Sequence, residues 1–150
     1  MRRGGREHGA SAVEFALVLP ILVLLVFGII TFGIVFARTQ GMEAAAREGA
    51  RTASLGRDVS EARVGTAVQN TAVPFINTQQ DIDFDILAGE NPGSQVKRTS
   101  NWCESTQTFV TVVVRVKDPG KYSLPIPLFG DITTSYEASG TFRCEAPHED

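Results

Sequence analysis

The sequence predicts an α+β fold in which a long N-terminal transmembrane helix continues into a small domain. Residues 15–37 contain no charged side chain, and as a helix they would rise about 35 Å, enough to cross a bilayer core of about 30 Å. A helical pattern follows at 59–72, and strand-like segments come after it. This order predicts a second helix packed on a mainly antiparallel sheet of three to four strands.

The chain of 150 residues has room for one modest domain besides the anchor. We expect residues 1–9 to be a disordered basic leader. Residues 10–54 are predicted to form the transmembrane helix and its protruding extension, and residues 55–150 the extracytoplasmic α+β domain. A secretory signal is the main alternative for the N-terminus, but its apolar region is normally about 7–15 residues long. The run here is longer, so we expect the helix to be retained.

The second helix has a start signal and a stop signal. Asp58 is the expected N-cap and Glu61 the third helical position, a pairing typical of helix starts. Pro74 disfavours helical geometry in the residue before it. We therefore expect the helix over about 59–72.

Residues 81–87 alternate between aspartate and apolar side chains, which predicts a half-buried strand. The D-x-D-x-D start also matches a calcium-binding EF-hand loop. The sixth and twelfth positions of that loop would be Ile86 and Pro92, where the motif requires glycine and glutamate. A solvated strand face is therefore the favoured interpretation, and no metal is expected.

Residues 108–117 are β-branched nearly throughout and predict the central strand. Two prolines confine residues 122–129 to an edge strand or an extended loop. Residues 132–144 are predicted to form the last strand, and by elimination its partner is the 108–117 strand.

That pairing would bring Cys144 beside Cys103, which precedes the central strand. In an oxidising compartment an even pair of cysteines suggests a disulfide. Closing a loop of roughly 40 residues would stabilise the fold by about 4 kcal/mol in the chain-entropy model. The alternative is two unrelated buried thiols, which spacing alone does not exclude.

The composition gives little support for catalysis or for nucleic-acid binding. The formal net charge of −3 is the wrong sign for a polyanion partner. His8 and His148 lie near opposite termini, and the sequence contains no catalytic-triad, zinc-protease, Walker or Rossmann pattern. We expect neither an enzyme nor a cofactor or small-molecule substrate.

The N-terminal residues carry a resemblance to a known family. A small-residue site, Gly9-Ala10, follows the basic leader, and Glu14 is the fifth residue counted from Ala10. This order resembles a class III signal peptide, the kind cut by prepilin peptidases. The run A-S-A-V-E-F-A-L-V-L-P, followed by E-A-A-A-R-E-G-A-R at 43–51, is similar to the TadE-like family of pilus-assembly pseudopilins. The residues that we assign to the second signature are Glu43, Arg47, Glu48, Gly49 and Arg51.

The resemblance implies a pilin-like outline and a membrane-anchored minor pilin or pseudopilin. The resemblance implies that the chain is cleaved between Gly9 and Ala10. It also implies that the protein acts in assembly of a tight-adherence (Flp-type) pilus or a related secretion apparatus. Its implied partners are the membrane, other pilins or pseudopilins, the prepilin peptidase and a membrane platform protein. The alternative function is an uncleaved single-pass module that binds an extracytoplasmic partner.

Glu14 has two interpretations. In pilins the fifth-position glutamate is thought to neutralise the N-terminal amine of an adjacent subunit, which would give Glu14 a role in subunit register. The alternative is a lone acid at the level of the lipid headgroups, where its cost is small.

The positive-inside rule hardly separates the two membrane orientations, because arginines flank the apolar run in similar number on both sides. The N-terminal amine, the cysteine pair and the resemblance favour the N-terminus inside. We therefore expect a single-pass protein of the cytoplasmic membrane with its C-terminal domain outside, or at the cell surface where it enters a pilus.

Residues 43–51 also leave two interpretations. They can form a solvated helix face laced with ion pairs, or a helix whose alanine-rich side packs against the C-terminal domain or a neighbouring subunit.

Overall fold

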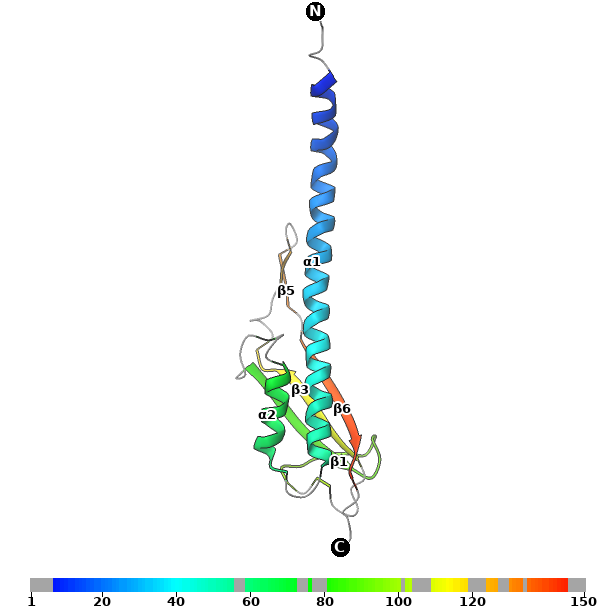
Figure 1. Ribbon diagram of the computed structural model, residues 1–150, viewed down its shortest axis with the longest axis vertical. Coiled ribbons are helices and arrows are strands. Elements are labelled where there is room, and N and C mark those ends of the chain that lie inside the picture. Colours follow the sequence, from blue (N-terminus) through cyan, green and yellow to red (C-terminus); the bar gives the residue numbers. More distant parts are fainter. Residues whose placement is uncertain are drawn as a thin grey trace, which may run out of the picture.

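The computed structural model describes residues 7–55, 59–72, 76, 81–100, 102–103, 109–118, 124–126, 130–133 and 135–145. Its elements, in order, are α1 (Glu7–Ser54), α2 (Glu61–Ala72), β1 (Ile82–Gly89), β2 (Val96–Lys97), β3 (Phe109–Val116), β4 (Leu124–Ile126), β5 (Gly130–Ile132) and β6 (Glu137–Arg143). Figure 1 shows α1 as a long rod whose N-terminal half stands clear of a small α+β body. The predicted fold class is confirmed.

Helix α1 runs for 48 residues and continues through Pro20 as one element. It begins at Glu7, three residues before the predicted start, so the end of the leader that we expected to be disordered is helical. Adding residues to an existing helix costs little compared with starting one, which explains how the helix extends past the apolar run. Its most apolar window has a mean hydropathy of 2.9, and no part of that window is buried.

The C-terminal part of α1 belongs to the core of the body. Small and apolar side chains recur there at spacings of three and four, which aligns them along one face of the helix. The buried members of this face are Met42, Ala45, Ala46, Ala50 and Ala53. One helix therefore provides both the bare rod and a wall of the body.

Helix α2 is confirmed, with a different N-cap. The Ser60 Oγ accepts a hydrogen bond from the Arg63 amide at 3.3 Å, so Ser60 caps the helix and Arg63 occupies the third helical position. Asp58, the predicted cap, lies outside the described residues. Serine and aspartate cap equally well, so the sequence alone did not separate two candidates two residues apart.

The main sheet has the order β2-β1-β3-β6, and every neighbouring pair is antiparallel. Strand β3 is central, as predicted, and β6 is its partner, as predicted by elimination. Helices α1 and α2 pack together against one face of this sheet, with α1 on β3 and β6 and α2 on β1 (Figure 1). The alternate side chains of β3 that face the helices are fully buried: Val110, Val112 and Val114.

The predicted last strand over 132–144 is too long. Ile132 belongs to β5, which pairs antiparallel with β4 in a separate two-stranded ribbon, and β6 begins only at Glu137. Gly130 opens β5 with a φ of +84°, a backbone conformation that favours glycine. Pro125 cannot donate to a central ladder, which keeps β4 out of the main sheet, as the edge prediction implied.

Candidate functional site

The residues of the predicted leader site lie at the exposed N-terminal end of α1. Gly9, Ala10 and Glu14 are all exposed, and a Cβ added at Gly9 would meet no described atom within 4 Å. Glu14 follows Ala10 by four residues, so it lies about 6 Å further along the axis on nearly the same face. The helix thus presents the Gly9-Ala10 bond and one carboxylate together at its tip.

Large apolar side chains surround the next turns of α1 on every side. They are exposed in the isolated chain, and the most exposed include Phe15, Leu17, Ile21, Phe32 and Phe36. The core helix of a soluble protein buries at least one stripe, whereas this segment buries none of its most apolar window. Such a surface suits a lipid environment or contact with other apolar helices.

The signature segment 43–51 has two faces with different roles. Its small residues face the body, and Gly49 lies at a close approach to it. A Cβ added at Gly49 would lie 2.5 Å from Val68 Cγ2 of α2 and 3.1 Å from Val112 Cγ1 of β3. The glycine therefore lets α1 touch α2 and the sheet at one point, and the alanine-rich side packs against the C-terminal domain.

The charged residues of the signature form two ion pairs on the exposed surface of the helix. Glu43 pairs with Arg47 at 3.7 Å and Glu48 with Arg51 at 3.8 Å, and all four side chains are substantially exposed. Exposed pairs of this kind contribute only about 0.3–0.5 kcal/mol each. Their value to the fold is therefore small.

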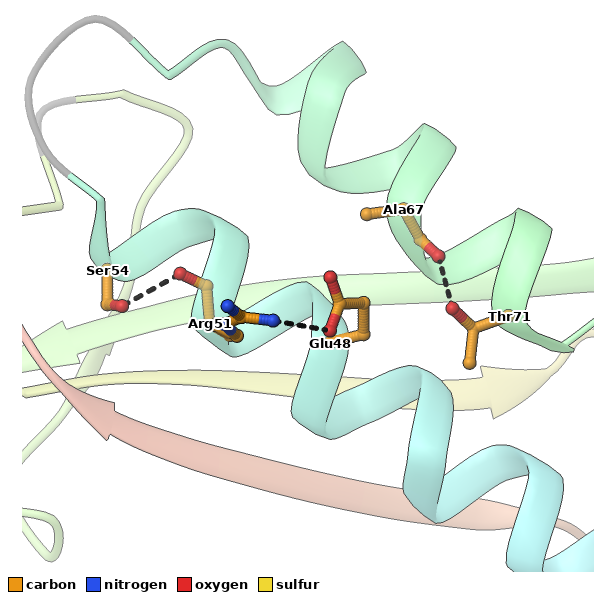
Figure 2. A network of polar contacts seen from close by, with 5 residues as sticks. All are labelled: Glu48, Arg51, Ser54, Ala67 and Thr71. Carbon is orange, nitrogen blue, oxygen red and sulfur yellow. Dashed lines mark hydrogen bonds and ion pairs between the residues drawn. The ribbon is translucent and has the colours of Figure 1, made fainter.

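Figure 2 shows Glu48 and Arg51 on the side of α1 that faces α2. Both line a groove of about 480 Å³ between the two helices, together with Arg63 and Asn70 of α2. Around the groove, the Ser54 hydroxyl donates to the Arg51 carbonyl at 2.8 Å and the Thr71 hydroxyl to the Ala67 carbonyl at 2.9 Å. The polar contacts drawn there hold each helix individually and do not join one helix to the other.

The C-terminal end of α1 is fastened by contacts that sequence analysis missed. Trp102 Nε1 donates to the Ala53 carbonyl at 2.9 Å, and the Glu145 amide donates to the Ser54 carbonyl at 3.1 Å. Helix ends leave such carbonyls without intrahelical partners. A disulfide joins Cys103 to Cys144, with their Cα atoms 5.6 Å apart, and it holds both donors in place. The only sequence signal was the single tryptophan beside a cysteine.

The aspartates of β1 do not all lie on a solvated strand face, contrary to what the sequence predicts. The alternation predicts that Ile82, Phe84 and Ile86 face the core. Ile82 and Ile86 are buried, and Phe84 is partly buried against the core. Asp83 is exposed, but the Asp85 side chain is only 18% exposed. Its carboxylate pairs with Lys97 of β2 and with Arg115 of β3, the latter at 3.1 Å. Two cations from neighbouring strands thus neutralise the carboxylate considered for calcium, and the described residues contain no cluster of three potential metal ligands.

The hydrogen bond from Lys97 to Asp85 and the negative charge of that carboxylate raise the pKa of the lysine above its ordinary 10.5. Because the folded-state pKa is raised, the stabilisation from this pair is complete below pH 10.5. The contribution of the lysine is lost as the pH rises through the raised pKa, so Lys97 keeps its charge at neutral pH.

A family model described as TadE-like protein matches residues 9–51. This N-terminal segment is similar to the TadE-like family. The match begins at Gly9 and ends at Arg51, so it spans the exposed tip, the apolar rod and the signature face that packs into the body. No curated protein and no solved structure matches the chain. The resemblance stated from the sequence is confirmed, and with the apolar helix it fits a membrane-anchored pilin-like protein.

The contact at Gly49 gives a testable prediction for this TadE-like segment. Gly49→Ala is expected to destabilise the fold by about 1–3 kcal/mol, because the added methyl overlaps Val68 and a β-branched side chain has little freedom to move. Val68→Ala alone should also destabilise, since Val68 is fully buried. Urea unfolding of both single variants and the double variant measures the coupling.

The double variant should cost clearly less than the sum of the two single variants, because removing the valine methyls makes room for the new one. Gly33→Ala is the matched control, since a Cβ there meets no described atom within 4 Å. Additive costs in the double variant would contradict the proposed contact.

Proposed function

We propose that the protein is a membrane-anchored minor pilin or pseudopilin that acts in assembly of a tight-adherence (Flp-type) pilus or a related secretion apparatus. The observation that carries this proposal is the division of α1. Its N-terminal half is apolar and bare, its C-terminal part builds the body, and the TadE-like match at 9–51 covers both.

In this proposal α1 spans the cytoplasmic membrane with its N-terminus inside and holds the body outside. The Cys103–Cys144 disulfide supports this orientation, because disulfides persist in oxidising compartments outside the cytoplasm. The partners are other pilins or pseudopilins, a prepilin peptidase and a membrane platform protein. Incorporation into a pilus would place the body at the cell surface.

The peptidase would cut between Gly9 and Ala10. Exposure of both residues supports access by an enzyme, and their place in the first turn of α1 means that only the weakly held end of the helix has to unwind. Cleavage would create an amine on Ala10. Glu14 of a neighbouring subunit could then pair with that amine in a medium of low dielectric, where opposite charges attract strongly and unpaired charges are penalised. Such a pair would set the register between packed helices.

Gly9→Val is expected to block processing, because a branched side chain at the cut would not fit a groove that accepts glycine. The variant and the wild type are expressed with a prepilin peptidase, and the mass of the membrane-extracted chain is measured. The wild type should start at Ala10 and the variant at Met1. Gly28→Val, in open space on the apolar rod, is the control that should still be cleaved.

A variant Gly9→Val that still starts at Ala10 would contradict the cleavage proposal. A wild-type chain that starts at Met1 despite an active peptidase would favour the alternative function, an uncleaved single-pass module that binds an extracytoplasmic partner. The observation that favours this alternative is that α1 runs without interruption across Glu7–Ser54, so the Gly9-Ala10 bond lies inside a helix.

A further inference from the structure

The β4–β5 ribbon lies outside the main sheet and runs along α1. Figure 1 shows it rising from the body beside the rod, with β4 running toward the N-terminal end of α1 and β5 returning. Strand β4 contacts α1. The ribbon therefore lies on the side of the body from which the bare half of α1 emerges.

The burial pattern of α1 indicates that another part of the chain covers one face of the helix. Thr31, Val35, Arg38 and Thr39 are partly buried, whereas the residues between Thr31 and Val35 and between Val35 and Arg38 are exposed. Their spacings of three and four place them on the same side of the helix. Val35 also packs against the hydrophobic core. The body and its ribbon thus extend over a face of α1 that lies within the apolar run.

The depth of this face can be placed relative to the charge-free run. The run ends at Ala37, so Val35 lies about 3 Å and Thr31 about 9 Å inside that end at 1.5 Å per residue. If α1 spans a bilayer with this run, an element beside Val35 lies at the outer membrane surface. The ribbon is then within reach of lipid headgroups.

The chemistry of the ribbon suits that position. Its chain carries no charged side chain from Leu124 to Gly130. Backbone groups that leave water must be paired, and β4 and β5 pair with each other, while Pro125 has no amide proton to leave unpaired. Asp131 is exposed on β5, and a carboxylate is tolerated at headgroup level but costly deeper.

We infer that the β4–β5 ribbon is a second membrane contact that rests in the headgroup region of the outer bilayer surface beside α1. The occupant of this surface is lipid. The ribbon and the helix together fix how far the body stands from the membrane and which way it faces. The inference rests on the proposed membrane anchoring, and it adds a contact that the anchor alone does not require.

Added tryptophans test the inference in the full chain, reconstituted at low density into phosphatidylcholine vesicles with or without brominated acyl chains. Ile126→Trp lies at the end of β4 nearest the membrane and Leu124→Trp at its other end. Phe32→Trp reports on the anchor, because Phe32 is strongly exposed on the apolar rod. Val96→Trp is the control on the body, and native Trp102, which is buried, gives a constant background.

Val96 is placed far from the ribbon by the sheet register. It pairs with Ala88, which pairs with Val110 and through it with Phe142, close to the C-terminal end of α1. Bromine is therefore expected to quench the added tryptophan strongly in Phe32→Trp, clearly in Ile126→Trp, less in Leu124→Trp and not at all in Val96→Trp. The emission of Ile126→Trp should also shift to the blue on reconstitution.

Quenching in Phe32→Trp without quenching in either β4 variant would overturn the ribbon contact and leave the anchor standing. Loss of quenching in Phe32→Trp as well would overturn the anchor, and with it the proposed function. Equal quenching in Val96→Trp and Ile126→Trp would also overturn the inference, because the body would then lie on the membrane without a preferred side.

Discussion

Gly140→Ala is expected to destabilise the protein by about 1–3 kcal/mol or more, although alanine is the better residue in a strand by about 0.5–1 kcal/mol. Gly140 lies in β6, directly beneath α1. A Cβ there would lie 2.6 Å from both the carbonyl carbon and the oxygen of Ala46, and 2.7 Å from Arg47 Cα. All three are backbone atoms of a helix, so none can rotate away. The helix and the strand would have to separate.

Urea unfolding of the full chain in detergent micelles measures this effect, with the emission of Trp102 as the signal. Trp102 is the only tryptophan, and it is buried beside the end of α1. Gly93→Ala is the matched control, because Gly93 is exposed and a Cβ there meets no described atom within 4 Å. An unchanged or raised midpoint for Gly140→Ala would show that α1 does not approach β6 as closely as the structure has it.

Loss of the Cys103–Cys144 disulfide is expected to have the largest effect on stability. The two residues are 41 apart in sequence, and the chain-entropy model gives about 4 kcal/mol for a loop of this length. The bond also holds the segments that carry Trp102 and Glu145, whose donors satisfy the last carbonyls of α1. Reduction should therefore lower the urea midpoint by roughly 1–4 M.

The double variant Cys103→Ala and Cys144→Ala distinguishes the effect of losing the disulfide from any other effect of the reductant. Its unfolding midpoint should match that of the reduced wild type, and adding reductant to it should change nothing. A reduced wild type that unfolds at the same urea concentration as the oxidised protein would contradict the expected role of the bond.

Several features of the fold followed from local patterns in the sequence. The apolar run, the helical spacing before Pro74 and the β-branched stretch of β3 each identify their element, because periodicity and side-chain shape act within one turn or one strand. Elimination was enough to pair β6 with β3. The order of residues along the chain also placed Gly9, Glu14 and the signature segment within one stretch, and the family match at 9–51 covers that stretch.

Other features depended on contacts between distant residues. The signature left open whether residues 43–51 form a charged, solvated helix face or pack their alanine-rich side against another surface. The close approaches at Gly49 and Gly140 arise only where α1 meets α2 and the sheet. Asp85 is largely shielded from solvent and pairs with Lys97 and Arg115, which belong to two other strands. Ile132 was predicted to belong to the last strand, but it lies in β5 and pairs with β4.

The sequence by itself determined that a charge-free helix precedes a small α+β domain, and which residues stand at the helix tip and in the signature. These properties are local, because hydropathy, helix propensity and motif order depend on neighbours in the chain. Only the tertiary structure decided how closely α1 lies on the sheet, what holds its C-terminal end and where the β4–β5 ribbon runs. Those depend on packing between segments far apart in sequence, where a distance of a few tenths of an ångström separates a contact from a clash.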